Sequence, residues 1–404
     1  MELLISAGQV LTGPAGERIT GGAVLVDQDT IVAVGRRDDI EPHASRDVTR
    51  LHRPDATVLP GLINSHVHLA FDAGPDPVTT LQGTDDTGLL LGMAGRARQL
   101  LDGGVTTARD LGDRGGLAVR LRDAVAAGTL PGPRLLAATA PLTAPAGHCW
   151  FFGGEVDGEQ AIREQVRRNA RGGADVIKVM VSGGQMTPSG ANMWESQFST
   201  EELRAAVEEA RELGLPVAAH AHGTAGIISA VTAGVNTIEH CSWLRDGQFD
   251  AREDIAAQMA EKGISVCPTM TPNWRGFRAM LGEERAEQFF GQVRWMDKLG
   301  VRLAAGTDAG VPRSVFDDFV SSFGMYDYLG FPNDRIIELA TVGAAGALGL
   351  GGDTGRLEAG FSADLLVVDG DPLTDLDTLR DIEIVLTRGR PHVPAQRGIQ
   401  RCRA

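Results

Sequence analysis

The sequence lacks the features that mark secreted, membrane-spanning and zinc-ribbon proteins. Its four cysteines are scattered without a CxxC pair, at Cys149, Cys241, Cys267 and Cys402, which argues against a zinc ribbon or a disulfide framework. No apolar run reaches the roughly 18–20 residues needed to span a bilayer. The N-terminus also lacks the basic region and long apolar region of a secretory signal. We therefore expect a cytoplasmic protein.

Positive charge is also in short supply. The formal net charge of −15 argues against nucleic acid or an anionic membrane as a partner. An apolar content of 43% is ordinary for a soluble globular protein. Because 404 residues exceed the usual size of a single core, we expect one large domain and a smaller one.

Short β-type runs alternate with helix-like segments in the middle of the chain, whereas both ends are β-rich. One helix-like segment begins with a capping box, Ser199 and Glu202, and stops at Gly214. The alternation predicts an α/β fold whose parallel strands close into a (β/α)8 TIM-type barrel. A doubly wound open sheet is the alternative, but no GxGxxG follows the first strand. The eight runs are GLINSHVHL, GVTTARDLG, PRLLAATAP, ADVIKVMVSGG, LPVAAHAHG, NTIEHCSW, ISVCPTMTP and VRLAAGTDAG.

Two histidines, His66 and His68, end the first of these runs. Alternate side chains of a strand point to the same face, so both imidazoles can converge on a metal ion. The alternative is a pair of half-buried histidines that cap a strand. Catalytic groups of such barrels lie at the carboxyl ends of the strands. Further residues competent for metal chemistry lie in or end the fourth, fifth, sixth and eighth runs, at Lys178, His220, His240 and Asp308.

Lys178 is the unusual member of this set, because an ammonium in an apolar strand is costly to bury. Burial lowers the pKa of a lysine, and the free amine can capture CO2 to form a carbamate that bridges two metals. The alternative is an ion pair with Asp175, Glu239 or Asp308. Both interpretations remain open at this point.

The combination of motifs resembles the metal-dependent amidohydrolase superfamily over nearly the full length of the chain. The matching segments are LPGLINSHVHL, GVTTARDLG, VIKVMVSGG, AAHAHG, TIEH, AGTDAG and TGRLEAGFSADLLVVDGDP. The sequence around Lys178 and HAHG is most similar to the branch that holds Xaa-Pro dipeptidases, metallocarboxypeptidases and ochratoxin-hydrolysing amidases. The resemblance implies a catalytic barrel over 58–352 and a small β-sandwich built from 1–57 and 353–404. It also implies a homo-oligomer.

The same resemblance implies a binuclear centre of two divalent metal ions, for which we expect Zn²⁺. His66 and His68 would hold the more buried ion, and His220 and His240 the more exposed one. N-carboxylated Lys178 would bridge the two ions. Asp308 would bind the buried ion and transfer protons.

Two divalent metals can lower the pKa of a bridging water and polarise the scissile carbonyl. Asp308 would accept a proton from this water, which leaves a hydroxide to attack the carbonyl. Asp308 would later deliver the proton to the leaving amine. His222 is an alternative ligand to His220, although the apolar run ends at His220. The tyrosines lie past the eighth run, so His148 and His222 are the candidate donors to the substrate oxyanion.

Aromatic residues in the loops after the strands predict a pocket wall for a sizeable apolar or aromatic group. These are Trp150, Trp194, Trp243 and Trp274; the alternative is that they pack the loops against one another. Met186 and Met193 belong to the same loops. A substrate carboxylate would need a cation, and Arg275 and Arg313 are candidates. Arg109 is another, although it can equally pair with a neighbouring aspartate.

The favoured function is hydrolysis of a small-molecule amide: a dipeptide, a C-terminal peptide bond or an N-acyl amino acid. A carbamate, urea, cyclic amide or lactone would suit the same site. A mononuclear deaminase is less favoured, because it would not need Lys178 and because Glu239 is expected to face away from His240. A non-catalytic scaffold would lack metal ligands, whereas all six are present.

Overall fold

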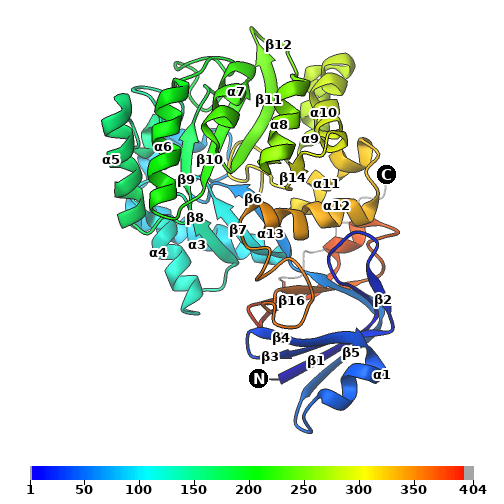
Figure 1. Ribbon diagram of the computed structural model, residues 1–404. Helices are drawn as coiled ribbons and strands as arrows, with labels where there is room; N and C mark the ends of the chain where they lie inside the picture. Colours follow the sequence, from blue (N-terminus) through cyan, green and yellow to red (C-terminus); the bar gives the residue numbers. More distant parts are fainter. Residues whose placement is uncertain (1, 395–404) are drawn as a thin grey trace.

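A computed structural model describes residues 2–394. Cys402 and the last ten residues of the expected C-terminal segment lie outside the described residues. Figure 1 shows two lobes, a larger one of strands and helices and a smaller one that holds both ends of the described chain. The mixed α/β content that the sequence predicts is therefore confirmed. Among the described helices, none combines the length and apolarity that crossing a membrane requires.

The larger lobe contains eight parallel strands in two sheets. One sheet has the order β6 (Leu62–Val67), β7 (Val105–Asp110) and β8 (Arg134–Ala137). The other has the order β14 (Arg302–Leu303), β13 (Ser265–Cys267), β11 (Thr237–Arg245), β10 (Val217–Gly223) and β9 (Ile177–Met180), with β12 (Gln248–Phe249) paired antiparallel to β11.

Backbone hydrogen bonds join the edges of these two sheets on both sides. Amides of residues 65–68 donate to carbonyls of residues 305–309, and the amide of Asp308 donates back to His66. On the other side, the Leu142 amide donates to Lys178 at 2.9 Å and the Met180 amide to Leu142 at 2.8 Å. The carboxyl ends of all eight strands therefore meet at one edge of the lobe.

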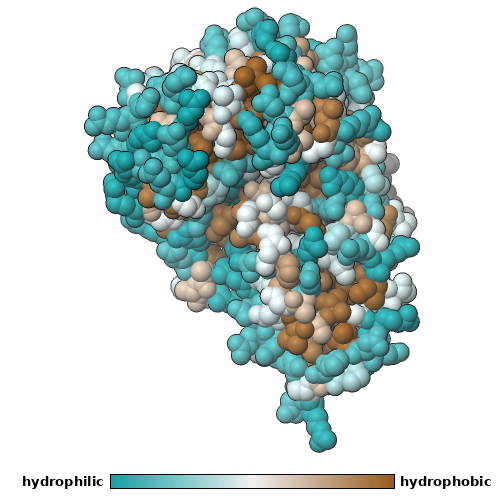
Figure 2. Space-filling view, viewed as in Figure 1, coloured by the Kyte–Doolittle hydropathy of each residue, from teal (hydrophilic) through white to brown (hydrophobic). Residues whose placement is uncertain are grey.

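Helices cover the outside of the parallel strands (Figure 1). The α6 helix begins at the capping box that the sequence predicts, with Ser199 and Glu202 bonded reciprocally, and it ends before Gly214, whose φ is +72°. Hydrophilic side chains dominate the exposed face of α5 and α6 in Figure 2. The helices are α2 (Pro77–Gly83), α3 (Asp86–Asp102), α4 (Leu117–Ala126), α5 (Gly158–Arg171), α6 (Thr200–Glu212), α7 (Thr224–Ala233), α8 (Glu253–Lys262), α9 (Trp274–Leu281), α10 (Glu283–Lys298), α11 (Phe319–Tyr328), α12 (Asn333–Leu339) and α13 (Val342–Ala347), with 3-10 turns at Trp150–Phe152 and Leu376–Arg380.

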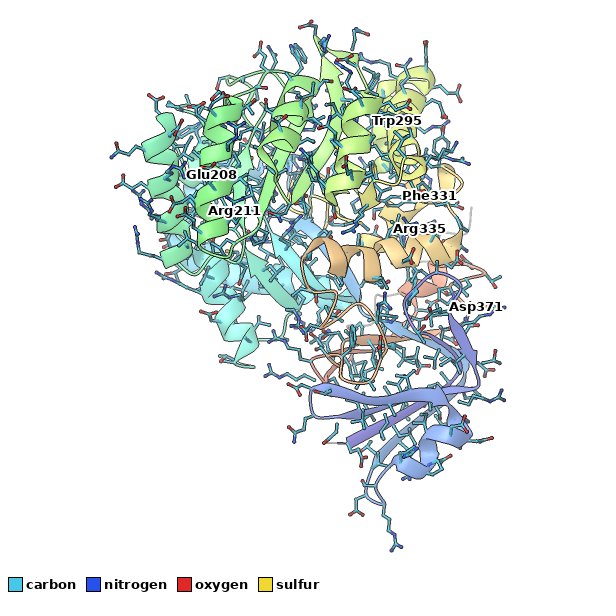
Figure 3. The ribbon with its side chains drawn as sticks, in the orientation of Figure 1. Glu208, Arg211, Trp295, Phe331, Arg335 and Asp371 are labelled. Carbon is cyan, nitrogen blue, oxygen red and sulfur yellow. The ribbon has the colours of Figure 1, made fainter. Side chains whose placement is uncertain are left out.

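Ion pairs on this outer surface join neighbouring helices. Glu208 of α6 accepts a hydrogen bond of 2.8 Å from Arg163 of α5, and Arg335 of α12 lies 2.9 Å from Asp297 of α10. Figure 3 labels Glu208 and Arg335 in these positions. Partly exposed pairs of this kind contribute little to stability, so the apolar core between helices and strands carries the fold.

The smaller lobe is one sheet to which both ends of the described chain contribute. Its order is β17-β16-β15-β5-β1-β3-β4, and β2 pairs with β1. The strands are β1 (Glu2–Leu11), β2 (Arg18–Thr20), β3 (Gly22–Asp27), β4 (Thr30–Arg36), β5 (Thr49–Pro60), β15 (Leu365–Asp369), β16 (Ile382–Thr387) and β17 (Arg390–His392), and α1 (Arg37–Ile40) with a 3-10 turn (Glu41–His43) follows β4. The antiparallel pairing of β15 with β5 brings segments about 300 residues apart in sequence into contact, as counted from their bounds.

Asp364 connects the two lobes through a buried carboxylate. Its Oδ2 lies 3.2 Å from Nη2 of Arg134 at the start of β8 and accepts a hydrogen bond of 2.9 Å from Thr354. Its Oδ1 accepts 2.7 Å from the Arg388 amide. Asp353 pairs with the same arginine at 2.6 Å but is 51% exposed, whereas the Asp364 side chain is 0% exposed. The two aspartates therefore differ mainly in burial.

Asp364→Ala should lower the free energy of unfolding by about 2–4 kcal/mol, because three donors lose a buried charged acceptor. Asp353→Ala, which removes the exposed partner of the same Arg134, should cost about 1 kcal/mol or less. Urea unfolding followed by circular dichroism measures both values. Equal losses for the two variants would contradict the role assigned to the buried carboxylate.

Candidate active site

Three side chains from the first and the last of the eight parallel strands converge where the carboxyl ends of the strands meet. His66 and His68 lie at the end of β6, and Asp308 follows β14. The Nε2 atoms of the two histidines are 3.2 Å apart, and Oδ1 of Asp308 lies 3.3 Å from each of them. This is the alternation expected for the HxH pair. The left-handed φ of Asp308, +57°, turns its carboxylate toward the imidazoles.

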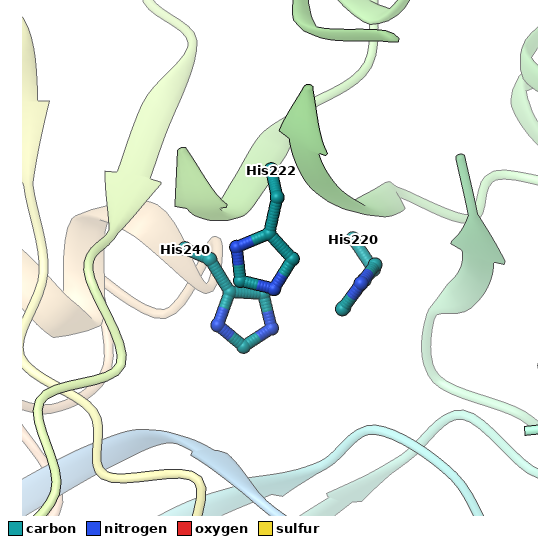
Figure 4. A group of neighbouring side chains, drawn as sticks. All are labelled: His220, His222 and His240. Carbon is teal, nitrogen blue, oxygen red and sulfur yellow. The ribbon is translucent and has the colours of Figure 1, made fainter. Parts of the chain in front are cut away.

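A second group, formed by His220, His222 and His240, has ligand atoms within 4.8 Å of one another. Figure 4 shows the rings of His222 and His240 stacked, with His220 beside them; the stacked ring centroids are 4.4 Å apart. The sequence argument that the strand ends at His220 is wrong, because β10 continues to Gly223. His220 and His222 therefore face the same side, and the geometry brings both to His240.

Lys178 of β9 faces the same cavity as these two groups. Its side chain is fully buried, and its Nζ has no hydrogen-bond partner among the described residues. Asp175, one of the partners considered for it, lies instead 2.6 Å from Arg122. Burial lowers the pKa of Lys178 to about 8, which makes the uncharged amine accessible near neutral pH.

These side chains fit a pair of divalent metal ions. Imidazoles bind metals in their neutral form, and burial, helped by the charge of Lys178, lowers the pKa of His66 to about 4. Oδ1 of Asp308 is buried without a hydrogen-bond donor among the described residues. An anionic oxygen, neutral imidazoles and an unpaired amine are thus gathered in one place.

Glu239 lies beneath this site, which corrects the expectation that it faces away from its neighbour. Its Oε2 accepts a hydrogen bond of 2.9 Å from Nδ1 of His66. The reason is the backbone: His240 has a left-handed φ of +68°, which breaks the alternation of the strand. Arg109 donates to the other oxygen at 2.7 Å, so its carboxylate partner is Glu239 rather than Asp110 or Asp113. Sequence alternation alone gave no signal for this contact.

A cavity of about 390 Å³ opens above the clustered side chains. His148 lines it from the loop after β8; this side chain is buried, and its Nδ1 has no partner among the described residues. Its ring centroid lies 4.6 Å from that of His220. The apolar part of the wall consists of phenylalanine, methionine, proline and valine side chains: Phe71, Met180, Met186, Met193, Pro268, Met270, Phe277, Phe289, Val311 and Pro312.

The tryptophans expected in the pocket wall are not among the residues that line this cavity. Trp243 is fully buried and packs edge-to-face on Trp295 at 5.8 Å, and Trp274 is buried against Tyr328. Trp150 is 40% exposed, and Trp194 packs near Gly247. Loop position after a strand does not fix the direction of a side chain, and the wall is built from phenylalanine and methionine.

The two arginines expected to bind a substrate carboxylate lie outside the cavity wall as well. Arg275 is exposed on α9 and its guanidinium lies 4.6 Å from the ring centroid of Trp274. Arg313 is exposed next to Pro312, which does line the cavity. Among the lining residues, Lys178 is the sole lysine or arginine.

Comparison with known proteins agrees with this site. The Amidohydrolase family model matches residues 57–391. Ochratoxinase of Aspergillus niger is 30% identical over 426 residues, covering 95% of this chain and 84% of that protein. The crystal structure of a Xaa-Pro dipeptidase with methionine bound in its active site has a TM-score of 0.85 and 28% identity, covering 97% of this chain and 100% of the other.

The crystal structure of A. niger ochratoxinase superimposes with a TM-score of 0.84 and 27% identity, covering 96% of this chain and 95% of that chain. The resemblance to Xaa-Pro dipeptidases and ochratoxin-hydrolysing enzymes that the motifs suggest is thereby confirmed. The family match covers the parallel strands and every side chain of the clustered site. The chain belongs to the amidohydrolase family and is a metal-binding hydrolase that acts on carbon–nitrogen bonds.

Proposed function

We propose that this enzyme hydrolyses the amide bond of a dipeptide or N-acyl amino acid that carries a bulky apolar group, using two divalent metal ions. The observation that carries the proposal is the arrangement around Lys178. A buried amine, without a hydrogen-bond partner in the described part of the chain, lines the same cavity as members of two separate groups of candidate ligands. A carbamate on this amine would supply the anionic oxygens that two neighbouring cations share.

In this proposal His66, His68 and Asp308 would hold one ion and His220 and His240 the other, and a carbamate on Lys178 would supply anionic oxygens to both. Zn²⁺ suits this set of nitrogen and oxygen donors. When bound, the ions would supply Lewis-acid activation of water and of the scissile carbonyl. His222 stands close enough to the second group to be an alternative ligand, and a hydrogen-bond distance of 2.9 Å to Ser242 fixes its ring.

The protein's own side chains move the protons. The ionised Asp308 carboxylate accepts a proton from the attacking water and returns it to the leaving amine, as a general base and then a general acid. His148 and His222 line the cavity, and each neutral ring has one N–H that can donate to the substrate carbonyl oxygen. The apolar wall excludes water around these steps.

The shape and chemistry of the cavity support the choice of substrate. Its volume of about 390 Å³ lies in the range of small-molecule sites, and its apolar wall favours an aromatic or branched group. Relatives of similar sequence are an ochratoxinase and a Xaa-Pro dipeptidase. We further infer that the eight parallel strands form a TIM-type barrel over 58–352 and that 1–57 and 353–404 form a small β-sandwich, whose described strands belong to one sheet. A carbamate, urea, cyclic amide or lactone is the alternative substrate class.

Lys178→Ala should lower kcat/KM by at least about 100-fold. Losing a residue that only supports a ligand costs up to about 100-fold, and Lys178 is proposed to act on the metals directly. Metal content per chain should fall from two, and the added mass of one CO2, measured on the intact protein without acidification, should disappear. Lys298→Ala, at an exposed position of α10, is the matched control. One metal and no bound CO2 in the unaltered enzyme would instead favour a mononuclear deaminase.

Phe289→Ala should lower kcat/KM for an N-acyl amino acid with an aromatic side chain by about 10- to 100-fold, because the apolar contact is lost. The same substitution should have little effect on the corresponding glycine or alanine substrate. Met280→Ala is the control, since Met280 lies on the neighbouring α9 but is 70% exposed. An equal loss for large and small substrates would rule out a side-chain pocket at Phe289.

A further inference from the structure

We propose that Arg109 and Glu239 are positioning residues that fix the tautomer and ring orientation of His66, and thereby set the affinity of the His66–His68–Asp308 group for its metal. The inference rests on the proposed metal site. It assigns a function to two charged side chains that lie outside the set of expected ligands.

The tautomer follows from the chemistry of the carboxylate. An ionised carboxylate only accepts hydrogen bonds, so the contact of 2.9 Å between Glu239 Oε2 and His66 Nδ1 requires the proton on Nδ1. The lone pair of His66 is then on Nε2. That atom is the one directed at His68 and Asp308, at 3.2 and 3.3 Å.

The ionised state of Glu239 is secured by its partners. The side chain is 0% exposed, and a buried carboxylate without compensation is costly. Oε1 accepts hydrogen bonds of 2.7 Å from Arg109 Nη2 and 2.6 Å from Thr237 Oγ1. Both carboxylate oxygens are therefore engaged by donors.

Arg109 is itself held in place by the strands on either side of it. Its Nε donates 2.8 Å to the carbonyl oxygen of Ser65, and its Nη1 donates 3.0 Å to Thr237. The guanidinium thus ties β7 to β6 and β11, which are the strands that carry His66 and Glu239. It leaves little freedom for the carboxylate to turn away from the imidazole.

The same guanidinium decides on which side of His66 a metal binds. His66, Glu239 and Cys267 also have ligand atoms within 4.8 Å of one another and could hold a cation below the ring. The charge of Arg109, 2.7 Å from Glu239, repels a cation there. The cation is directed instead to the Nε2 side, where the group with Asp308 lies.

Glu239→Ala should lower the affinity for one of the two metal ions by about 10- to 100-fold, the range for loss of an outer partner of a histidine ligand. The affinity for the other ion should not change. Glu239→Gln, which keeps an acceptor for Nδ1–H, should lose less. Both affinities are measured by Zn²⁺ titration against a chromophoric chelator. Glu209→Ala is the matched control, because Glu209 is also a buried carboxylate, paired at 2.6 Å with Arg167 on the outer helices.

A measurement on the unaltered, metal-free protein does not depend on how the Glu239 variants fold. Nitrogen-15 spectra of histidine-labelled enzyme should show His66, assigned with His66→Asn, as the Nδ1–H tautomer. The Nε2–H tautomer, or a Glu239→Ala variant that binds both metals as tightly as the unaltered enzyme, would overturn the inference alone. Fewer than two metals in the unaltered enzyme would overturn the proposed function as well.

Discussion

The parallel hydrogen bonding of β9, β10 and β11 fixes the place at which each functional side chain meets the cavity. In this register Ala218 stands beside Lys178, and His220 stands beside Glu239. A parallel ladder holds all carboxyl ends at one edge, so residues from separate strands meet there without any contact in sequence. Shifting one strand by a single residue would send its functional side chain to the opposite face. The placement of the clustered side chains therefore depends on a register that the apolar core maintains.

Close packing at the cavity floor adds a second constraint. A Cβ on Gly306 would lie 2.5 Å from Sγ of Cys267 and 3.1 Å from the His66 amide, and one on Gly184 would lie 2.5 Å from the ring of His148. Neither clash can be relieved without moving a residue of the site. The glycines thus allow the backbone to approach histidines that are buried and fixed, which is the preorganisation that binding metals and substrate requires.

Sequence patterns predicted those parts of the site that follow from regular strand geometry. His66 and His68 converge as the alternation predicts, although the pairing of β6 with β7 shifts register between Asn64 and Val67. Lys178 enters from a buried strand, as its apolar neighbours indicate. Glu239 could not be placed in this way, because the left-handed backbone at His240 interrupts the alternation. The sequence pattern also could not predict the direction of the Trp243 side chain, because it depends on packing against Trp295, which is distant in sequence.

The charged groups of the site are arranged in two layers. The groups of the lower layer are paired with each other, whereas those of the upper layer are not. In the lower layer, Glu239 and Arg109 satisfy each other, as buried charges normally must. In the upper layer, Nζ of Lys178 and Oδ1 of Asp308 are buried and have no hydrogen-bond partner within residues 2–394. Pairing Lys178 with a carboxylate would keep it as an ammonium and remove its nucleophilic lone pair. Glu239 is engaged by Arg109 and His66, and among the described residues it makes no hydrogen bond to Lys178.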